Sequence, residues 1–127
     1  STLHSPLKRE NVVKDKSFAF ALRIVKLAKY LQAEKKEYVI SKQMLRSGTA
    51  IGALVREAEH AQSKADFISK MSIALKEASE TDYWIELLHQ SDELNEESYR
   101  SIYPDIQELI KLLVSILKTS KENRSGN

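Results

Sequence analysis

The sequence predicts an all-α protein, an antiparallel up-and-down four-helix bundle, and three observations support this prediction. Its 127 residues include only three Gly and two Pro, too few for a β protein rich in turns. Apolar side chains recur at steps of three and four residues along four separate segments. The polar breaks between these segments are short, and short connections make consecutive helices antiparallel neighbours.

The first two helices are each marked by one apolar stripe on an otherwise polar surface, as is typical of bundle helices. We expect the first helix over about 14–34, followed by a polar break at 35–37, and the second over about 41–60. The stripe of the first helix consists of Phe20, Ile24, Leu27 and Leu31. The stripe of the second consists of Ile40, Met44, Ser47, Ile51, Leu54 and Ala58.

The third and fourth helices begin with start signals. Ser63 has the character of an N-cap, and Asp66 places a negative charge in the first turn of a helix expected over about 64–91. Two glutamates begin the fourth helix, expected over about 96–121. The inward residues of the third helix are Ile68, Met71, Leu75, Ala78 and Ile85. Those of the fourth are Ile102, Ile106, Leu109, Leu113 and Ile116.

Pro104 lies inside the fourth segment, where proline removes one backbone hydrogen bond and clashes with the preceding turn. Either the helix kinks there, or a short turn over about 96–102 precedes a main helix that Pro104 begins. We favour the kink.

Composition and length limit the class of protein. The helices define one domain over 11–121, between flexible tails at 1–10 and 122–127. The absence of cysteine excludes a disulfide framework and a thiolate metal site. No apolar run reaches the roughly 20 residues that a membrane span needs, and we see no signal peptide. We therefore expect a cytoplasmic protein that does not enter a membrane.

The small net charge of +2 conceals a segregation of charge along the chain. Residues 1–56 hold 12 basic and 4 acidic side chains, whereas residues 57–108 hold 4 basic and 13 acidic ones. Such segregation indicates either pairing between helices or a basic surface for an anionic partner, and we favour pairing.

Small residues and aromatic residues indicate two close contacts. Gly48 and Gly52 lie four residues apart on one helix face, so a neighbouring helix can approach closely, either within the subunit or in another subunit. Tyr83 and Trp84 are adjacent and cannot both face the core. One of them is therefore expected at a groove or subunit contact, or partly buried at the edge of the bundle.

Charged residues separated by alanines run along the second and third helices. Arg46 and Glu57 belong to the second helix, and Lys70 and Glu77 belong to the third. Because the turn between these helices lies near residue 62, Arg46 should be level with Glu77 and Glu57 with Lys70. We interpret the four as a polar network that sets register or subunit orientation, with a catalytic or ligand-binding role as the alternative.

The first helix exposes a basic face that could contact the phosphates of a nucleic acid. A solvated amphipathic face is the favoured interpretation, because no nucleic-acid-binding motif accompanies the charge. The residues of this face are Lys14, Lys16, Arg23, Lys26 and Lys29.

Two Glu-x-x-His sequences, Glu57–His60 and Glu86–His89, resemble half of a di-iron carboxylate site. In the bundle they would lie roughly 28 Å apart along the helices, too far to share a metal. No nucleophile with a neighbouring base is evident either. We expect no metal, no cofactor and no catalytic residue.

Several segments resemble one protein family over about residues 11–120. The more specific pieces are Arg46-Ser47-Gly48-Thr49 and Glu80-Thr81-Asp82-Tyr83-Trp84. They resemble the bacterial four helix bundle protein family, encoded by intervening sequences in 23S ribosomal RNA genes. The resemblance implies an up-and-down subunit that often forms a homopentamer. It also implies a relationship to accessory proteins of diversity-generating retroelements, basic pentamers that work with a reverse transcriptase and nucleic acid.

We therefore expect a non-enzymatic homo-oligomer, with a pentamer favoured, that acts as a scaffold or accessory protein. RNA or a nucleic-acid-processing protein is its candidate partner. The alternative is a small ligand-binding or enzymatic bundle that uses the Arg46, Glu57, Lys70 and Glu77 network. A third hypothesis is a protein–protein adaptor with an exposed apolar patch.

Overall fold

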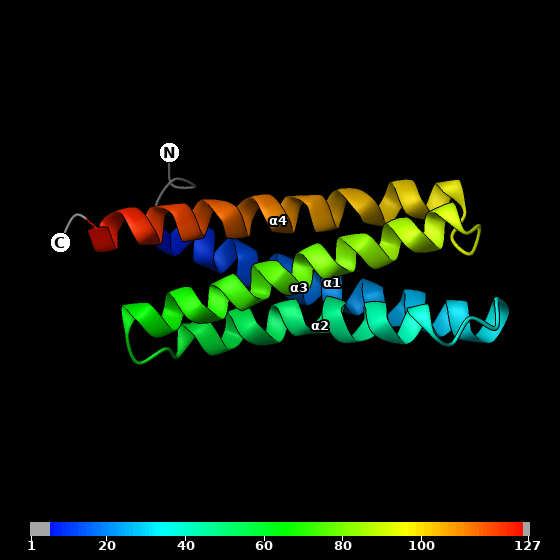
Figure 1. The fold of residues 1–127 in the computed structure, drawn as a ribbon, viewed down its shortest axis with the longest axis horizontal. Helices are drawn as coiled ribbons and strands as arrows, with labels where there is room; N and C mark the ends of the chain where they lie inside the picture. Colours follow the sequence, from blue (N-terminus) through cyan, green and yellow to red (C-terminus); the bar gives the residue numbers. More distant parts are fainter. Residues whose placement is uncertain (1–5, 126–127) are drawn as a thin grey trace.

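The structure is a computed structural model that describes residues 6–125. It confirms the predicted all-α class and consists of four helices with three short connections (Figure 1). The helices are α1 (Pro6–Glu34), α2 (Ile40–Glu59), α3 (Lys64–Gln90) and α4 (Glu96–Ser125).

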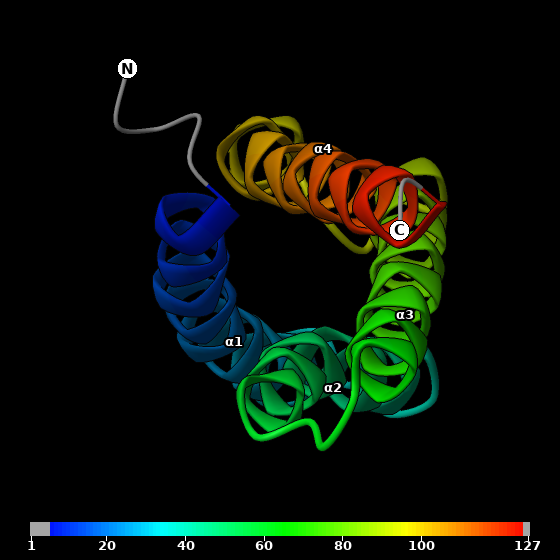
Figure 2. The same ribbon diagram turned by 90° about the vertical axis from the view of Figure 1, so that its left-hand side faces the viewer.

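Consecutive helices run antiparallel and surround a common core, as the view along the bundle shows (Figure 2). Each helix packs against the next in sequence, and α4 closes the ring against α1. The helices α1 and α3 consequently lie on opposite sides of the bundle. This placement matters for the site, because α1 and α2 carry the basic part of the chain and α3 the acidic part.

The core contains the apolar stripes that the sequence predicts. Leu27, Ile40, Leu54 and Leu75 are only partly buried and pack against its margin. The largest fully buried side chains are Phe20, Ile24, Leu31, Met44, Ile51, Met71, Ile85, Leu88, Leu94, Ile106, Leu109 and Leu113.

The helix starts are held by side-chain caps. Ser63 Oγ accepts a hydrogen bond of 3.0 Å from the Asp66 backbone N–H, which confirms the predicted cap of α3. The start of α2 uses a cap that the sequence did not reveal, the carboxylate of Glu37. This carboxylate accepts hydrogen bonds from the backbone N–H groups of residues 39, 40 and 41. Because the first turn of a helix has unpaired N–H donors, this one side chain fixes where α2 begins.

Both outer ends of the bundle extend beyond the domain limits that the sequence predicts. Helix α1 already begins at Pro6, so residues 6–10 are helical rather than part of a tail. Arg9 explains this extension, because its guanidinium donates to Ser115 Oγ at 2.7 Å and Thr119 Oγ1 at 3.0 Å on α4. Helix α4 continues to Ser125. Residues 1–5 and 126–127 lie outside the described residues.

Helix α4 runs without a break through Pro104, so it does not begin there. Proline has no backbone N–H, so Pro104 cannot donate a hydrogen bond to the carbonyl of Arg100, one turn earlier. Both residues are exposed. Water can therefore satisfy that carbonyl. Within residues 6–125, no helix has the length and apolarity that crossing a bilayer requires.

Candidate functional site

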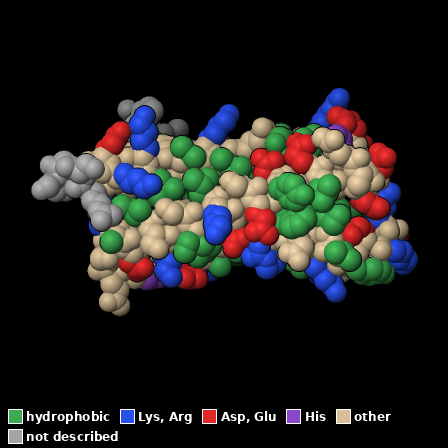
Figure 3. Space-filling view, in the orientation of Figure 1, with side chains coloured by type: hydrophobic (Ala, Val, Ile, Leu, Met, Phe, Trp, Pro, Cys, Tyr) green, Lys and Arg blue, Asp and Glu red, His purple; other side chains and the backbone are tan. Residues whose placement is uncertain are grey.

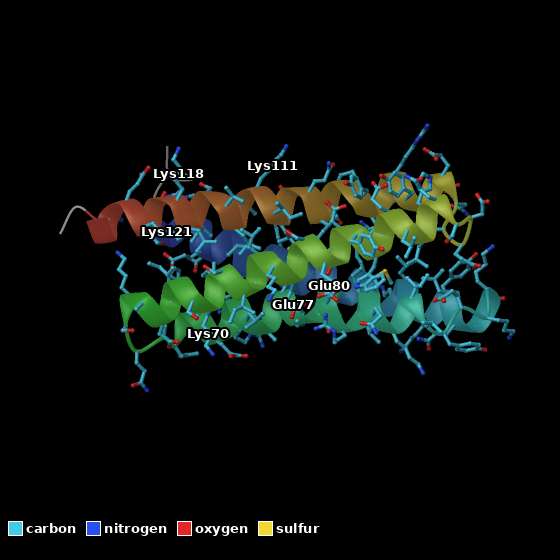
Figure 4. The ribbon with its side chains drawn as sticks, in the orientation of Figure 1. Lys70, Glu77, Glu80, Lys111, Lys118 and Lys121 are labelled. Atoms are coloured by element: carbon cyan, nitrogen blue, oxygen red, sulfur yellow. The ribbon has the colours of Figure 1, made fainter. Side chains whose placement is uncertain are left out.

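A charged cluster joins α2 to α3 on the outside of the bundle. Arg46 Nη2 lies 2.6 Å from Glu80 Oε1 and 3.2 Å from Glu77 Oε1. The indole Nε1–H of Trp84 donates to the same Glu80 oxygen at 3.1 Å. Figure 4 shows Glu77 and Glu80 close together at the middle of α3. Arg46 is thus held by two carboxylates one turn apart.

This cluster stays charged at neutral pH. The hydrogen bond from Arg46 lowers the pKa of the Glu80 carboxyl, and the Trp84 N–H contributes further. Hydrogen bonds to Glu80 and Glu77 raise the pKa of the Arg46 guanidinium. The Arg46 side chain is 52% exposed, however, and exposed ion pairs contribute little to stability. The cluster therefore orients α2 and α3 more than it stabilises them.

The second predicted pair also forms, with Lys70 Nζ 3.2 Å from Glu57 Oε1. Eleven residues separate Arg46 from Glu57 on α2, which places the two pairs roughly 16 Å apart along the helix. The four predicted residues are therefore two separate bridges between the same helices and share no common centre. The sequence prediction omitted Glu80, although its spacing of three residues from Glu77 and four from Trp84 places it on the same face.

The two glycines of α2 pack against α1 within the subunit. A Cβ atom on Gly48 would lie 2.9 Å from Ile24 Cγ2, and one on Gly52 would lie 3.3 Å from the Ser17 carbonyl oxygen. Both glycines therefore contact α1 within the subunit, which is one of the two alternatives that the sequence left open.

Buried hydroxyl groups lie behind the charged cluster, a feature that the sequence analysis did not identify. Ser47 and Thr81 are both fully buried, and their hydroxyl oxygens are 2.8 Å apart. Thr81 Oγ1 is also 2.8 Å from the Glu77 carbonyl oxygen. A hydroxyl has one proton, so Thr81 donates to this carbonyl and accepts from Ser47, or donates to Ser47. Either arrangement links α2 to α3 through the core.

An open groove of about 530 Å³ lies between α1 and α2. Phe18, 52% exposed, forms part of its apolar lining, and the Arg56 guanidinium lies 5.5 Å from the centroid of the Phe18 ring. This distance fits a cation–π contact. We call this surface the α1–α2 groove; its lining residues are Lys14, Phe18, Ala21, Thr49, Gly52, Ala53, Arg56, Glu57 and His60.

A second apolar surface lies on α3, across the bundle from α1. Tyr83 is 58% exposed, and its ring packs edge-on against Trp84 with the ring centroids 5.0 Å apart. Figure 3 shows a hydrophobic cluster over this part of α3 with acidic side chains around it. We call this surface the α3 patch; it consists of Tyr83, Trp84 and Leu87. The structure thus exposes Tyr83 and half-buries Trp84.

The basic face of α1 is largely neutralised by the neighbouring helices. Lys14 Nζ lies 2.8 Å from Glu59 Oε1, and Lys16 Nζ lies 3.2 Å from Glu108 Oε1. Arg23 Nη1 lies 2.6 Å from Asp105 Oδ2. Lys26 and Lys29 are exposed and form no ion pair with any described residue. The five predicted nucleic-acid contacts therefore do not form a continuous free cationic surface.

Aromatic rings stack between α3 and α4. The Tyr99 ring lies parallel to His89 with centroids 3.8 Å apart, and its hydroxyl donates to Glu86. This hydrogen bond to a carboxylate raises the pKa of Tyr99 to about 12. Burial raises the pKa of Tyr103, whose ring stacks on Tyr99. Both phenols stay neutral over the physiological pH range.

We expect Tyr99 to make the bundle sensitive to strong alkali. Its folded-state pKa is raised, so its contribution is fully present below pH 10, the ordinary pKa, and is lost as the pH rises toward 12. Thermal unfolding followed by circular dichroism at pH 9 and pH 12 should show a larger drop in Tm for the wild type than for Tyr99→Phe. Equal drops in Tm would contradict this assignment.

The two Glu-x-x-His sequences are used in different ways. Glu86 binds Tyr99, and His89 Nε2 lies 2.8 Å from Glu96 Oε1. Glu57 pairs with Lys70, while His60 lines the α1–α2 groove. Among residues 6–125, no three His, Asp or Glu side chains come together in a way that could hold a metal ion.

Comparison with known proteins agrees with this fold. A family model described as 23S rRNA-intervening sequence protein matches residues 9–115. The chain is also similar to a crystal structure of a protein with unknown function, from the S23 ribosomal protein family of Bacteroides thetaiotaomicron. The two sequences are 61% identical, the match covers 87% of this chain and 98% of that chain, and the TM-score is 0.85. No curated protein matches. The chain therefore belongs to the 23S rRNA-intervening sequence protein family.

Proposed function

We propose that this protein is a non-enzymatic subunit that assembles into a closed homo-oligomer, a pentamer, and acts as a scaffold or accessory protein for an RNA-associated partner. One observation carries the proposal. The subunit exposes two unlike apolar surfaces, the α1–α2 groove and the α3 patch, on different sides of the bundle. Exposed apolar surface of this kind marks a contact site.

The two surfaces have complementary charge. Lys14, Arg56 and Glu57 line the α1–α2 groove, and because Lys14 pairs with Glu59 and Glu57 with Lys70, Arg56 is the lining cation without an ion pair among the described residues. Glu80 and Glu86 lie beside the α3 patch, in the part of the chain where acidic residues prevail. A groove of one subunit can therefore receive the α3 patch of another, with opposite charges facing each other around the apolar contact.

A contact between two unlike surfaces is called heterologous. Repeated heterologous contacts form a closed ring when the rotation from each subunit to the next adds up to a full turn. A self-complementary dimer would instead bring the groove to a second groove, with the unpaired Arg56 of each subunit in the same contact. The charge distribution thus favours a ring over a dimer. Both the number five and RNA as the associated partner come from the family resemblance, the latter through the accessory proteins of diversity-generating retroelements.

The alternative, a ligand-binding or enzymatic centre at Arg46, Glu57, Lys70 and Glu77, has less support. These side chains form two surface bridges, and only Glu57 lines the 530 Å³ groove. A catalytic centre would need its acid, base and substrate within hydrogen-bond reach of one another.

Light scattering coupled to size-exclusion chromatography tests the assembly. The wild type should have about five times the 14.5 kDa subunit mass. Phe18→Glu in the groove and Tyr83→Lys in the patch should each reduce the mass to that of one subunit. The matched control for Phe18→Glu is Val114→Glu, which introduces the same negative charge at an exposed valine of α4 and should leave the mass unchanged.

A mixture of the two variants distinguishes a heterologous contact from a symmetric one. Each variant keeps one intact surface, so the Phe18→Glu and Tyr83→Lys chains should form a heterodimer of twice the 14.5 kDa mass and stop there. A single-subunit mass for the wild type would refute the proposal. So would a wild-type mass for both variants.

A further inference from the structure

We propose that an outward ridge of α4 binds the phosphodiester backbone of duplex RNA. The ridge consists of Lys111, Val114, Lys118 and Lys121, and we call it the α4 ridge. The choice of RNA over other polyanions rests on the proposed function. The location of the contact rests on the charges and spacing of the residues themselves.

The lysines of the α4 ridge differ from many other cations of the bundle in being unpaired. All three are exposed, and none forms an ion pair with a described residue. Six other cations are engaged by carboxylates of the same subunit. These are Lys14, Lys16, Arg23, Arg46, Lys70 and Arg100. Free positive charge that can neutralise an external phosphate is therefore present on the C-terminal half of α4, as it also is at Lys26, Lys29 and Lys42.

The spacing of these lysines suits a linear polyanion. Lys118 follows Lys111 by seven residues, two helical turns, so both side chains leave the helix on the same side. Lys121 follows one turn later, and Figure 4 shows the three along the C-terminal half of α4. From Lys111 to Lys121 the ridge spans roughly 15 Å at about 1.5 Å per residue. A nucleic-acid strand passes about four phosphates over that length, at about 3.4 Å per phosphate.

Two carboxylates of α4 flank the ridge. Glu108 is directed to α1, where its Oε1 lies 3.2 Å from Lys16 Nζ. Glu122 is exposed, one turn beyond Lys118, and is the nearer opposing charge. With Glu122 counted, the ridge keeps a net positive charge, and its three lysine side chains are exposed to solvent.

The chemistry of the ridge favours a nucleic-acid duplex over a protein or a single strand. Protein interfaces are depleted in lysine and have an apolar centre, whereas Val114 is the one exposed apolar side chain between the lysines. Proteins that bind single strands stack the bases on aromatic rings, and residues 104–127 contain no aromatic residue. Lysines alone contact phosphates and read no bases, so binding should be independent of sequence.

Assembly would multiply this contact. The α4 ridge lies outside both the α1–α2 groove and the α3 patch, so each subunit of a ring would keep its own ridge exposed. Several ridges on one duplex would bind far more tightly than one, because the later contacts become intramolecular.

Fluorescence anisotropy with a labelled RNA duplex of about 20 base pairs tests the ridge. In the variant, Lys111, Lys118 and Lys121 are all replaced by glutamine. The matched control replaces Lys26, Lys29 and Lys42, which are also exposed and without an ion pair among the described residues, and it removes the same charge. The ridge variant should bind about tenfold more weakly or worse, and the control within about threefold of the wild type.

Salt dependence gives a second readout. Between about 50 and 200 mM salt, the wild-type affinity should fall steeply, and the ridge variant should lower the log–log slope by about 2–3 for each subunit engaged. Equal losses in both triple variants would overturn the assignment, as would the absence of salt-sensitive binding at micromolar protein. Tighter binding to the single strand, to a DNA duplex of the same sequence, or to polyglutamate would also overturn it.

Light scattering on the same samples separates this proposal from the assembly. A monomeric wild type whose RNA binding still depends on the three lysines would refute the ring and support the ridge. An intact ring whose ridge variant binds RNA like the wild type would refute the ridge and leave the assembly standing.

Discussion

Replacing Phe20 by alanine is expected to lower the free energy of unfolding by about 3–5 kcal/mol. Phe20 is 2% exposed and belongs to the largest fully buried side chains of the bundle. The substitution loses the free energy of transferring an aromatic ring from water to the core. It also leaves a cavity, because the long packed helices cannot move together to fill the space. Urea unfolding monitored by circular dichroism measures the loss.

Phe18→Ala is the matched control, because it makes the same chemical change two residues away on the same helix. Phe18 is 52% exposed in the α1–α2 groove, so its truncation should cost the isolated subunit less than about 1 kcal/mol. It should instead weaken self-association, measured as an earlier dissociation of the assembly on dilution. Similar losses of subunit stability in the two variants would contradict the opposite orientations of these rings.

Gly48→Val is expected to destabilise the protein by about 3 kcal/mol, the upper end of the cost of overpacking a core. Even a Cβ atom here would lie 2.9 Å from Cγ2 and 3.1 Å from Cγ1 of Ile24. Ile24 is completely buried and, being β-branched on a helix, has one strongly preferred rotamer, so it cannot turn away. The backbones of α1 and α2 must move apart instead.

A double-mutant cycle with Ile24→Ala isolates this contact. Ile24→Ala alone costs about 2–5 kcal/mol, but it removes Cγ1 and Cγ2, the two carbons that would lie nearest to a Cβ atom at position 48. Gly48→Val should then cost nothing further in the Ile24→Ala background. Gln43→Val, at an exposed position of α2, controls for the helix propensity of valine. An equal cost of Gly48→Val in both backgrounds would show that the steric contact is not responsible.

Much of the fold could be predicted because its signals are local. The start of α3 at Lys64 follows from the Ser63 cap, and the stripe from Phe20 to Leu31 identifies the inward face of α1. The start of α1 could not be predicted in this way. Residues 6–10 are helical because Arg9 reaches Ser115 and Thr119 on α4, and no local pattern reveals partners so distant in the chain.

The charged bridges could be predicted in part. Counting outward from the turn near residue 62 pairs Arg46 with Glu77, because antiparallel helices advance by the same rise per residue. The same counting shows which residues lie at the same height along the two helices, but it does not show in which direction their side chains point. The long Arg46 side chain extends a turn further to Glu80, where it makes its shorter contact of 2.6 Å, and Trp84 completes that arrangement.

The sequence by itself determined that this chain forms four antiparallel amphipathic helices, and it led to the correct family. These properties depend on periodicity, caps and short turns, all of which act within a few residues. Only the tertiary structure decided that α1 packs closely against the glycines of α2. It also decided which lysines are left without an ion pair among the described residues. In the sequence, Lys16 and Lys118 cannot be told apart, because each is a lysine in a segment where basic residues prevail. Glu108, from the far end of the chain, lies beside one of them and not the other.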